Sequence, residues 1–156
     1  MNGIGIGLKV IAATLALGAS APQATAVSGS AVSRCHTRSL TAVLVKDGAG
    51  LGHSFYKIGL RNTSERTCWV KGYPGVSFLG ARRHQIGRSA KRVPRRVRRV
   101  TVKPREAAVA KLDVATGACK RVRRSRYLRV IPPDETRSLV IRARVVVCRS
   151  TVYPLR

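Results

Sequence analysis

The residues with the clearest chemical potential belong to the stretch RSAKRVPRRVRRVTVKPR, which runs from Arg88 to Arg105 and contains no acidic residue. A second basic cluster, KRVRRSR, occupies residues 120–126. Guanidinium groups present paired N–H donors that match two oxygens of a phosphate or carboxylate group. The clusters therefore predict a surface that binds polyanions through charge, with little stereochemical selectivity. The candidate polyanion-binding residues are Arg82, Arg83, Arg88, Lys91, Arg92, Arg95, Arg96, Arg98, Arg99, Lys120, Arg121, Arg123 and Arg124.

The local structure expected for the first cluster is a loop that leads into a strand. Its prolines argue against a helical recognition arm. In a strand, Val100 and Val102 would face the core, and Arg99 and Lys103 would face solvent. Outward charges also protect an edge strand from pairing with another sheet. This alternative explains about two or three charges, whereas residues 82–105 contain eleven Lys or Arg residues.

The whole chain shares this imbalance of charge. Its 156 residues include 31 Lys or Arg but only 6 Asp or Glu, a formal net charge of +25 at pH 7. Such a charge attracts polyanions whatever else the protein does. A hydrophobic content of 44% argues against a disordered chain, and an aromatic content of 4% leaves few rings on which single-stranded nucleic acid could stack.

Catalysis and metal binding have weaker support. The three histidines, His36, His53 and His84, are scattered, and no two have the spacing that directs a pair of imidazoles at one metal ion. No serine lies in a G-x-S-x-G nucleophile motif. A small ribonuclease would need paired acid and base groups beside a phosphate clamp, and nothing marks such a pair. We therefore expect no enzyme activity, catalytic residue, metal or other cofactor, with a cryptic hydrolase or nuclease as an alternative.

The first 26 residues have the pattern of an export signal. Lys9 and the amino terminus precede the apolar run VIAATLALG, and the small residues ATA end at the expected cleavage point. The run is too short to span a bilayer, so no transmembrane segment is expected in the mature chain. An uncleaved anchor or a disordered leader is the alternative. The predicted parts are a signal peptide (1–26), a short flexible leader (27–34) and a β-sandwich domain (35–156).

Four cysteines follow the signal, at positions 35, 68, 119 and 148. None forms a close pair such as C-x-x-C, so a zinc site or a redox motif is not expected. An even number in an exported chain indicates two disulfides, for which three pairings are possible. We favour the sequential pairing, Cys35–Cys68 with Cys119–Cys148. Each loop of about 30 residues would then add roughly 3–4 kcal/mol to the stability of the domain.

Alternation of apolar and polar residues dominates the rest of the chain. Segments with this pattern are separated by turn sequences such as NTSE, GYPG and PPDE. No segment has the long apolar stripe of an amphipathic helix. The pattern predicts an all-β sandwich of about seven to nine strands. We expect strands at residues 40–46, 54–61, 67–70, 76–79, 98–103, 107–112, 126–131 and 137–147.

The longest of these segments, residues 137–147, shows the alternation most clearly. Arg142 and Arg144 would lie on one face, toward solvent. The opposite face would carry Leu139, Ile141, Ala143, Val145 and Val147. The arginines therefore occupy the solvent-facing positions of a pattern whose other positions already specify a core.

Several motifs occur together in the order found in one protein family. They are the N-T-S turn at 62–64, Cys68, the G-Y-P-G-V turn at 72–76, HQIGR at 84–88, VTVKP at 100–104, Cys119, Pro132-Pro133, Cys148 and the V-Y-P sequence at 152–154. With them, residues 35–155 resemble an exported actinobacterial family recorded as a domain of unknown function. The resemblance implies an immunoglobulin-like β-sandwich with two disulfides and no established catalytic role. The family usually has Pro-Gly where this chain has Pro104-Arg105-Glu106.

Two other patterns have both a structural and a functional interpretation. Asn62-Thr63-Ser64 matches a glycosylation sequon, but we favour a turn between strands. Trp69 follows Cys68 closely, and we expect it to pack in the core beside a disulfide rather than to stack on a ligand.

Together these features predict a secreted, non-enzymatic protein that associates electrostatically with anionic polymers. Export would separate it from cytosolic nucleic acid, so the expected partners are wall phosphopolymers, acidic glycans, anionic lipid surfaces or extracellular DNA. No small-molecule ligand is evident, and no amphipathic anchor helix is present. The alternative is a structural or protein-interaction module whose charge serves only solubility.

Overall fold

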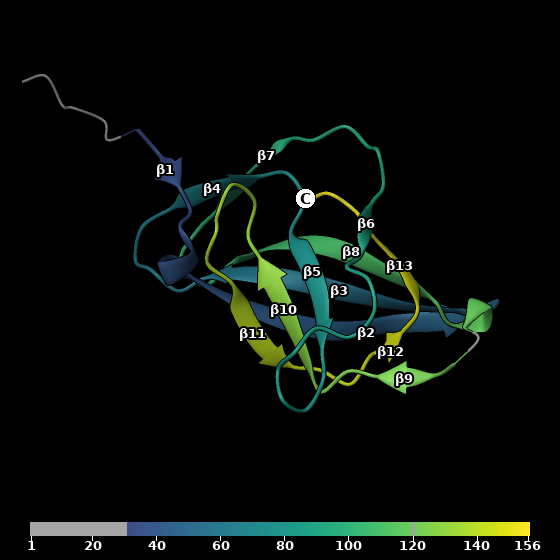
Figure 1. Cartoon of the computed structure of the whole chain (residues 1–156). Coiled ribbons are helices and arrows are strands. Elements are labelled where there is room, and N and C mark those ends of the chain that lie inside the picture. Colours follow the sequence, from purple (N-terminus) through teal and green to yellow (C-terminus); the bar gives the residue numbers. More distant parts are fainter. Residues whose placement is uncertain (1–30, 120) are drawn as a thin grey trace, which may run out of the picture. The chain divides into compact units, whose positions relative to one another are not determined.

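The computed structural model describes residues 31–119 and 121–156, which form an all-β domain (Figure 1). The predicted signal peptide and the first half of the predicted leader, residues 27–30, lie outside the described residues. Nine of the described strands have four or more residues: β2 (Leu40–Gly50), β3 (His53–Asn62), β4 (Cys68–Lys71), β5 (Gly75–Leu79), β7 (Arg99–Val102), β8 (Ala107–Ala115), β10 (Tyr127–Ile131), β11 (Leu139–Arg142) and β13 (Arg149–Val152). The first eight overlap the predicted segments, whereas β13 was not predicted. The shorter elements are β1 (Ser33–Arg34), β6 (Lys91–Arg92), β9 (Arg123–Arg124), β12 (Val146–Val147) and the 3-10 helices η1 (Thr37–Ser39) and η2 (Thr116–Ala118).

The largest sheet has five strands in the order β2-β3-β8-β13-β6. Its centre is antiparallel, and β6 runs parallel to β13 at one edge. Alternate residues of β8, from Ala108 to Val114, are fully buried, which is the period-two pattern expected of a strand with one buried face. The β2–β3 hairpin turns at Leu51 and Gly52, which both have positive φ, as the tightest hairpin turns require.

A three-stranded sheet, β11-β10-β5, crosses the five-stranded sheet and covers its buried face (Figure 1). In this smaller sheet Leu128 pairs with Phe78, and Val130 pairs with Val76. All four side chains are buried and belong to one cluster with the inward residues of β3 and β8. A third sheet, β1-β4-β7, and the short β12-β9 pair complete a sandwich-like fold.

The prediction of one continuous strand over residues 137–147 is wrong. The chain forms β11, leaves the ladder after Arg142, and pairs again as β12. The break arises because the buried Ser125 hydroxyl enters it, donating to the Ala143 carbonyl at 2.6 Å and accepting from the Val145 amide at 3.0 Å. The alternation itself is confirmed at the break, since Ala143 and Val145 are buried while Arg142 and Arg144 are exposed.

Both predicted disulfides are confirmed, Cys35–Cys68 and Cys119–Cys148. They are compatible with an oxidising compartment. The prediction that Trp69 packs in the core is wrong. Because its neighbours on β4, Cys68 and Val70, face the core, period-two geometry turns the indole outward.

Two turns explain residues that the sequence left ambiguous. Asn62 is fully buried, and its amide nitrogen donates to the carbonyls of Arg66 and Val102 at 2.8 and 3.0 Å. This favours the predicted structural turn over a glycosylation site. The turn after β7 keeps its tight geometry without glycine, because Arg105 adopts the left-handed conformation with φ of 68°.

Candidate anion-binding site

A loop rich in arginine connects β6 to β7 and arches over one end of the domain (Figure 1). We call residues 93–98 the arginine loop. Its backbone has no regular hydrogen-bond ladder, and Pro94 removes one donor. The arginines at positions 95, 96 and 98 are exposed, whereas Val93 and Val97 are half-buried. The loop therefore turns its apolar residues inward and its charges outward.

Tyr73, in the turn between β4 and β5, holds the arginine loop in place. Its hydroxyl donates to the Val93 carbonyl at 2.7 Å and accepts from the Arg95 amide at 3.0 Å. The Arg92 guanidinium lies over the Tyr73 ring, 5.8 Å from its centroid. The Val93 amide in turn donates to the Val152 carbonyl at 3.0 Å, which ties the start of the loop to β13. The loop is thus fixed by specific bonds at its β6 end.

A pocket of about 670 Å³ lies beneath the loop, and residues following β13 form its other wall. Among the described residues, ten line this arginine pocket and none of the ten is acidic. Six are cationic, and the remaining four give it a partly apolar floor. The lining residues are Arg95, Arg96, Arg98, Arg99, Val100, Lys111, Tyr153, Pro154, Leu155 and Arg156.

The sheet positions the cations that come from outside the loop. Tyr153 donates its amide to the Lys111 carbonyl at 2.9 Å, and Arg156 exchanges two backbone hydrogen bonds with Val109. The ammonium of Lys111 lies 4.2 Å from the centroid of the Phe55 ring and 5.7 Å from that of Tyr153. Cation–π contacts of this kind hold a charged head in place while leaving it unneutralised.

The charges that surround the arginine pocket are not compensated within the described chain. Across residues 31–119 and 121–156, ion pairs engage only four basic side chains, Arg34, His36, His53 and Lys57. None of the four lines the pocket. Guanidinium groups without an internal partner keep their donors available for an external oxyanion.

The structure distributes the thirteen predicted residues over several places. Arg95, Arg96, Arg98 and Arg99 line the arginine pocket. Arg88, Lys91, Arg121 and Arg123 line two further hollows beside the second disulfide. Arg82 and Arg83 lie in the turn after β5, where the Arg83 guanidinium covers the Tyr127 ring. Arg92 and Arg124 lie on β6 and β9, and Lys120 lies outside the described residues.

Sequence reasoning missed several cations that belong to these sites. Lys111 lies mid-strand on β8, and Arg156 and Arg149 lie far along the chain from both basic tracts. For Lys111 an available signal was its outward position in the alternation of β8. Arg149 and Arg156 carried no such signal, because they approach the first tract through the parallel pairing of β6 with β13 and, for Arg156, through its backbone hydrogen bonds with Val109.

Two histidine–carboxylate pairs are also present, and no pattern in the sequence indicates them. His53 Nδ1 lies 2.7 Å from an Asp113 oxygen, and His36 Nδ1 lies 3.0 Å from a Glu135 oxygen. The hydroxyl and amide of Thr37 also donate to Glu135, and with His36 they lower the pKa of that carboxyl from 4.5 to about 2. The contacts of Glu135 with His36 and Thr37 therefore connect η1 to the turn before β11.

Two features are absent from the residues that the structure describes. No three His, Cys, Asp or Glu side chains converge there as a set of metal ligands. No helix in the described part of the chain has the length and apolar character needed to cross a membrane.

Comparison with known proteins places the chain in a family. Residues 35–154, more than half of the chain, match the family described as a domain of unknown function (DUF4232). No curated protein and no solved structure matches the chain. The resemblance expected from the spacing of the cysteines and turns is thereby confirmed, and the protein belongs to the DUF4232 family.

Proposed function

We propose that this domain is a secreted, non-enzymatic protein that binds anionic polymers through the arginine loop and the pocket beneath it. The observation that carries the proposal is the convergence of six cationic side chains on one pocket without internal ion pairs. Phosphate and carboxylate groups are the natural partners of such side chains.

The two disulfides support the extracellular part of this proposal, because such bonds persist in oxidising compartments. The polyanions available there are wall phosphopolymers, acidic glycans, anionic lipid surfaces and extracellular DNA. A concave pocket beneath an arched loop suits a chain-like ligand better than it suits a flat bilayer.

The alternative is that the charge serves solubility alone. A solubilising surface needs only exposed charges, and it gains nothing from a loop that one tyrosine hydroxyl fixes at two backbone positions. The edge position of β7 in the β1-β4-β7 sheet explains an outward Arg99, but it does not explain the arginines of the loop.

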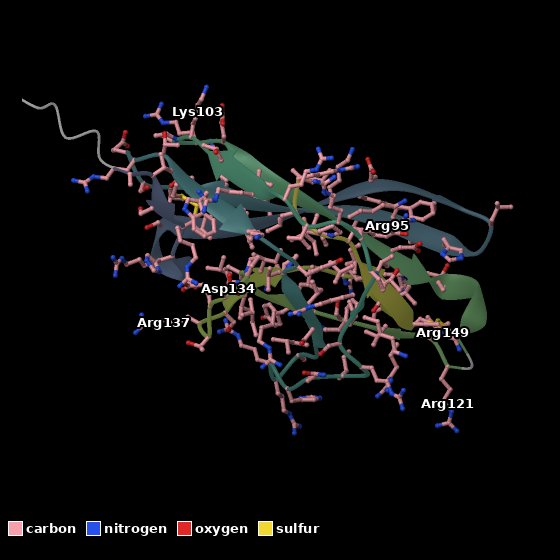
Figure 2. The ribbon with its side chains drawn as sticks, turned by 90° about the horizontal axis from the view of Figure 1, so that it is seen from above. Arg95, Lys103, Arg121, Asp134, Arg137 and Arg149 are labelled. Atoms are coloured by element: carbon pink, nitrogen blue, oxygen red, sulfur yellow. A yellow bond between two sulfur atoms is a disulfide. The ribbon has the colours of Figure 1, made fainter. Side chains whose placement is uncertain are left out.

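Two variants of equal net charge test the proposal. The loop variant replaces Arg95, Arg96, Arg98 and Arg99 with Gln. The control variant replaces, also with Gln, four exposed arginines that do not line the arginine pocket: Arg38, Arg66, Arg137 and Arg142. Figure 2 labels one residue of each set, Arg95 and Arg137, and the two lie in different parts of the domain in that view. Retention of the oxidised proteins is measured on wall phosphopolymer, acidic glycan, duplex DNA and anionic vesicles at rising salt concentrations.

The salt dependence of binding gives the expected size of the difference between the two variants. For duplex DNA, six contacting cations give a slope of log affinity against log salt of about −5, and removal of four reduces it to about −2. We expect the loop variant to show this reduction and the control variant to keep most of the slope. Equal losses in the two variants would show that binding follows net charge alone and would refute a defined site.

A further inference from the structure

A second group of cationic side chains lies beside Cys148, at the start of β13. Two adjoining hollows of about 640 and 460 Å³ share Arg88 and Arg149 in their walls. We call them together the Arg88–Arg149 hollow. In Figure 2, Arg121 and Arg149 lie near the same end of the ribbon, where β13 begins. The site is separate from the arginine pocket, since the two share no lining residue.

Ser150, which lines this hollow, places a polar group on a strand face that is otherwise apolar. Ser150 alternates with Val152 on the buried face of β13, and it is only 5% exposed. Its Oγ has no hydrogen-bond partner among the residues that the structure describes. A buried hydroxyl without a partner is costly, whereas alanine at the same position would bury no polar atom.

The loop opposite Ser150 is held close to the sheet. Gly87 has a φ of 70°, and a Cβ there would lie 2.6 Å from a methyl carbon of Val147. Gly87 therefore allows the chain to pass against β12 and to bring Arg88 to the hollow. The neighbouring Ser89 hydroxyl is already engaged with Ser77 at 2.9 Å, which leaves Ser150 as the free hydroxyl of the site.

From this geometry we infer that the Arg88–Arg149 hollow binds the tetrahedral oxyanion of a phosphate group, with Ser150 Oγ as a hydroxyl donor. Two guanidinium groups, the Lys91 ammonium and one hydroxyl line the hollow, and with two hydrogen bonds from each guanidinium they can donate about six in all. A carboxylate has two oxygens and can accept about four hydrogen bonds, fewer than the hollow can donate. A phosphate group has three or four strongly accepting oxygens and can accept all of them.

This site is independent of the arginine loop, so its failure would leave the proposed function of the loop untouched. The phosphate can come from free phosphate or from a phosphodiester in a polymer. Both sources are probed, with inorganic phosphate and with short poly(glycerol phosphate) as ligands. Sodium chloride at matched ionic strength controls for screening in both arms.

The test compares Ser150→Ala with Ser138→Ala, which changes an exposed serine outside the hollow. Calorimetric titration of the full, oxidised chain should show phosphate affinity about tenfold weaker for Ser150→Ala, the usual effect of losing one hydrogen bond to a charged group. The melting temperature of Ser150→Ala in chloride should equal or exceed that of the unmodified protein. Ser138→Ala should match the unmodified protein in both measurements.

A second pair of variants separates site from net charge. Arg149→Gln should weaken phosphate binding, whereas Arg144→Gln, an exposed arginine outside the hollow, should not. The loop variant should retain phosphate binding even if it loses polymer retention. Three results would each overturn the inference: no phosphate binding by the unmodified protein, unchanged affinity in Ser150→Ala, or equal effects of Arg149→Gln and Arg144→Gln.

In the loop variant, which lacks four arginines of the arginine pocket, stronger binding of the polymer than of inorganic phosphate would identify the phosphodiester as the source. Comparable binding of the two would identify free phosphate. Either result supports the site, since both require the same donors.

Discussion

Replacement of Tyr73 by Phe tests whether the shape of the arginine loop matters in addition to its charge. The substitution keeps the net charge of +25 and the ring beneath Arg92, and it removes only the hydroxyl. That hydroxyl bonds to Val93 and Arg95 at 2.7 and 3.0 Å. Two lost hydrogen bonds of about 1 kcal/mol each would weaken the attachment of the loop by about 1–2 kcal/mol.

The consequence for binding follows from the fraction of molecules whose loop is still arched. If closure of the loop is favoured by no more than about 0.5 kcal/mol in the unmodified protein, a loss of this size leaves the loop closed in a minority of molecules. The apparent affinity for a polyanion then falls by about three- to tenfold. The salt slope should stay the same, because the number of cations that contact the ligand is unchanged.

The assay measures binding of a fluorescent 20-base-pair DNA duplex by anisotropy at several salt concentrations, together with hydrogen exchange of the Arg95 amide. We expect weaker binding, an unchanged slope and faster exchange. Faster exchange with unchanged affinity would refute the reasoning, because the loop would then have opened without any cost to binding. The arginine loop would then attract DNA through its charge alone, whatever its shape.

Three further predictions concern stability. Arg105→Gly should raise the free energy of unfolding by about 0.5–1 kcal/mol in denaturant titrations, because glycine relieves the left-handed φ of 68°, whereas Arg105→Ala should give no gain. Glu135 has its pKa lowered from 4.5 to about 2, so its contribution is complete above pH 4.5 and is lost as the pH falls toward 2. Glu135→Gln should reduce the dependence of the unfolding free energy on pH between 2 and 4.5, and a slope as steep as that of the unmodified protein would contradict this reasoning. Replacing Cys119 and Cys148 together with Ala should lower the unfolding free energy by about 3 kcal/mol, measured by the same titrations, and an unchanged value would contradict the role of that bond.

Local patterns were sufficient to predict most of the fold. Period-two alternation located β2, β3, β8 and β10, and the order of the four cysteines led to the correct pairing. These predictions succeeded because burial of one sheet face is visible in adjacent residues. The break between Ala143 and Val145 was not visible, because the hydroxyl that causes it belongs to Ser125, about 20 residues earlier in the chain.

The candidate site shows the same limit more strongly. The basic tracts supplied four arginines of the arginine pocket, but Lys111 and Arg156 enter it only through strand pairing and the backbone bonds beside β8. Ser150 could not have been identified from the sequence at all. A serine in an alternating strand is unremarkable until the structure shows that its hydroxyl is buried and lacks a partner.

The two cationic sites are related by the strand pairing at the edge of the five-stranded sheet. Thr151 pairs with Lys91 and Val152 with Arg92 in a parallel ladder, so the segments that follow and precede these pairs run in the same direction. The Arg88–Arg149 hollow lies at the start of both segments, and the arginine pocket lies at their end. Seven residues separate Arg149 from Arg156, which corresponds to at most about 23 Å of extended chain. A linear phosphopolymer long enough to span that distance could occupy both sites at once, and binding at one would raise its effective concentration at the other. For this reason we expect affinity to rise steeply once the polymer spans both sites, a dependence that neither net charge nor a single pocket would produce.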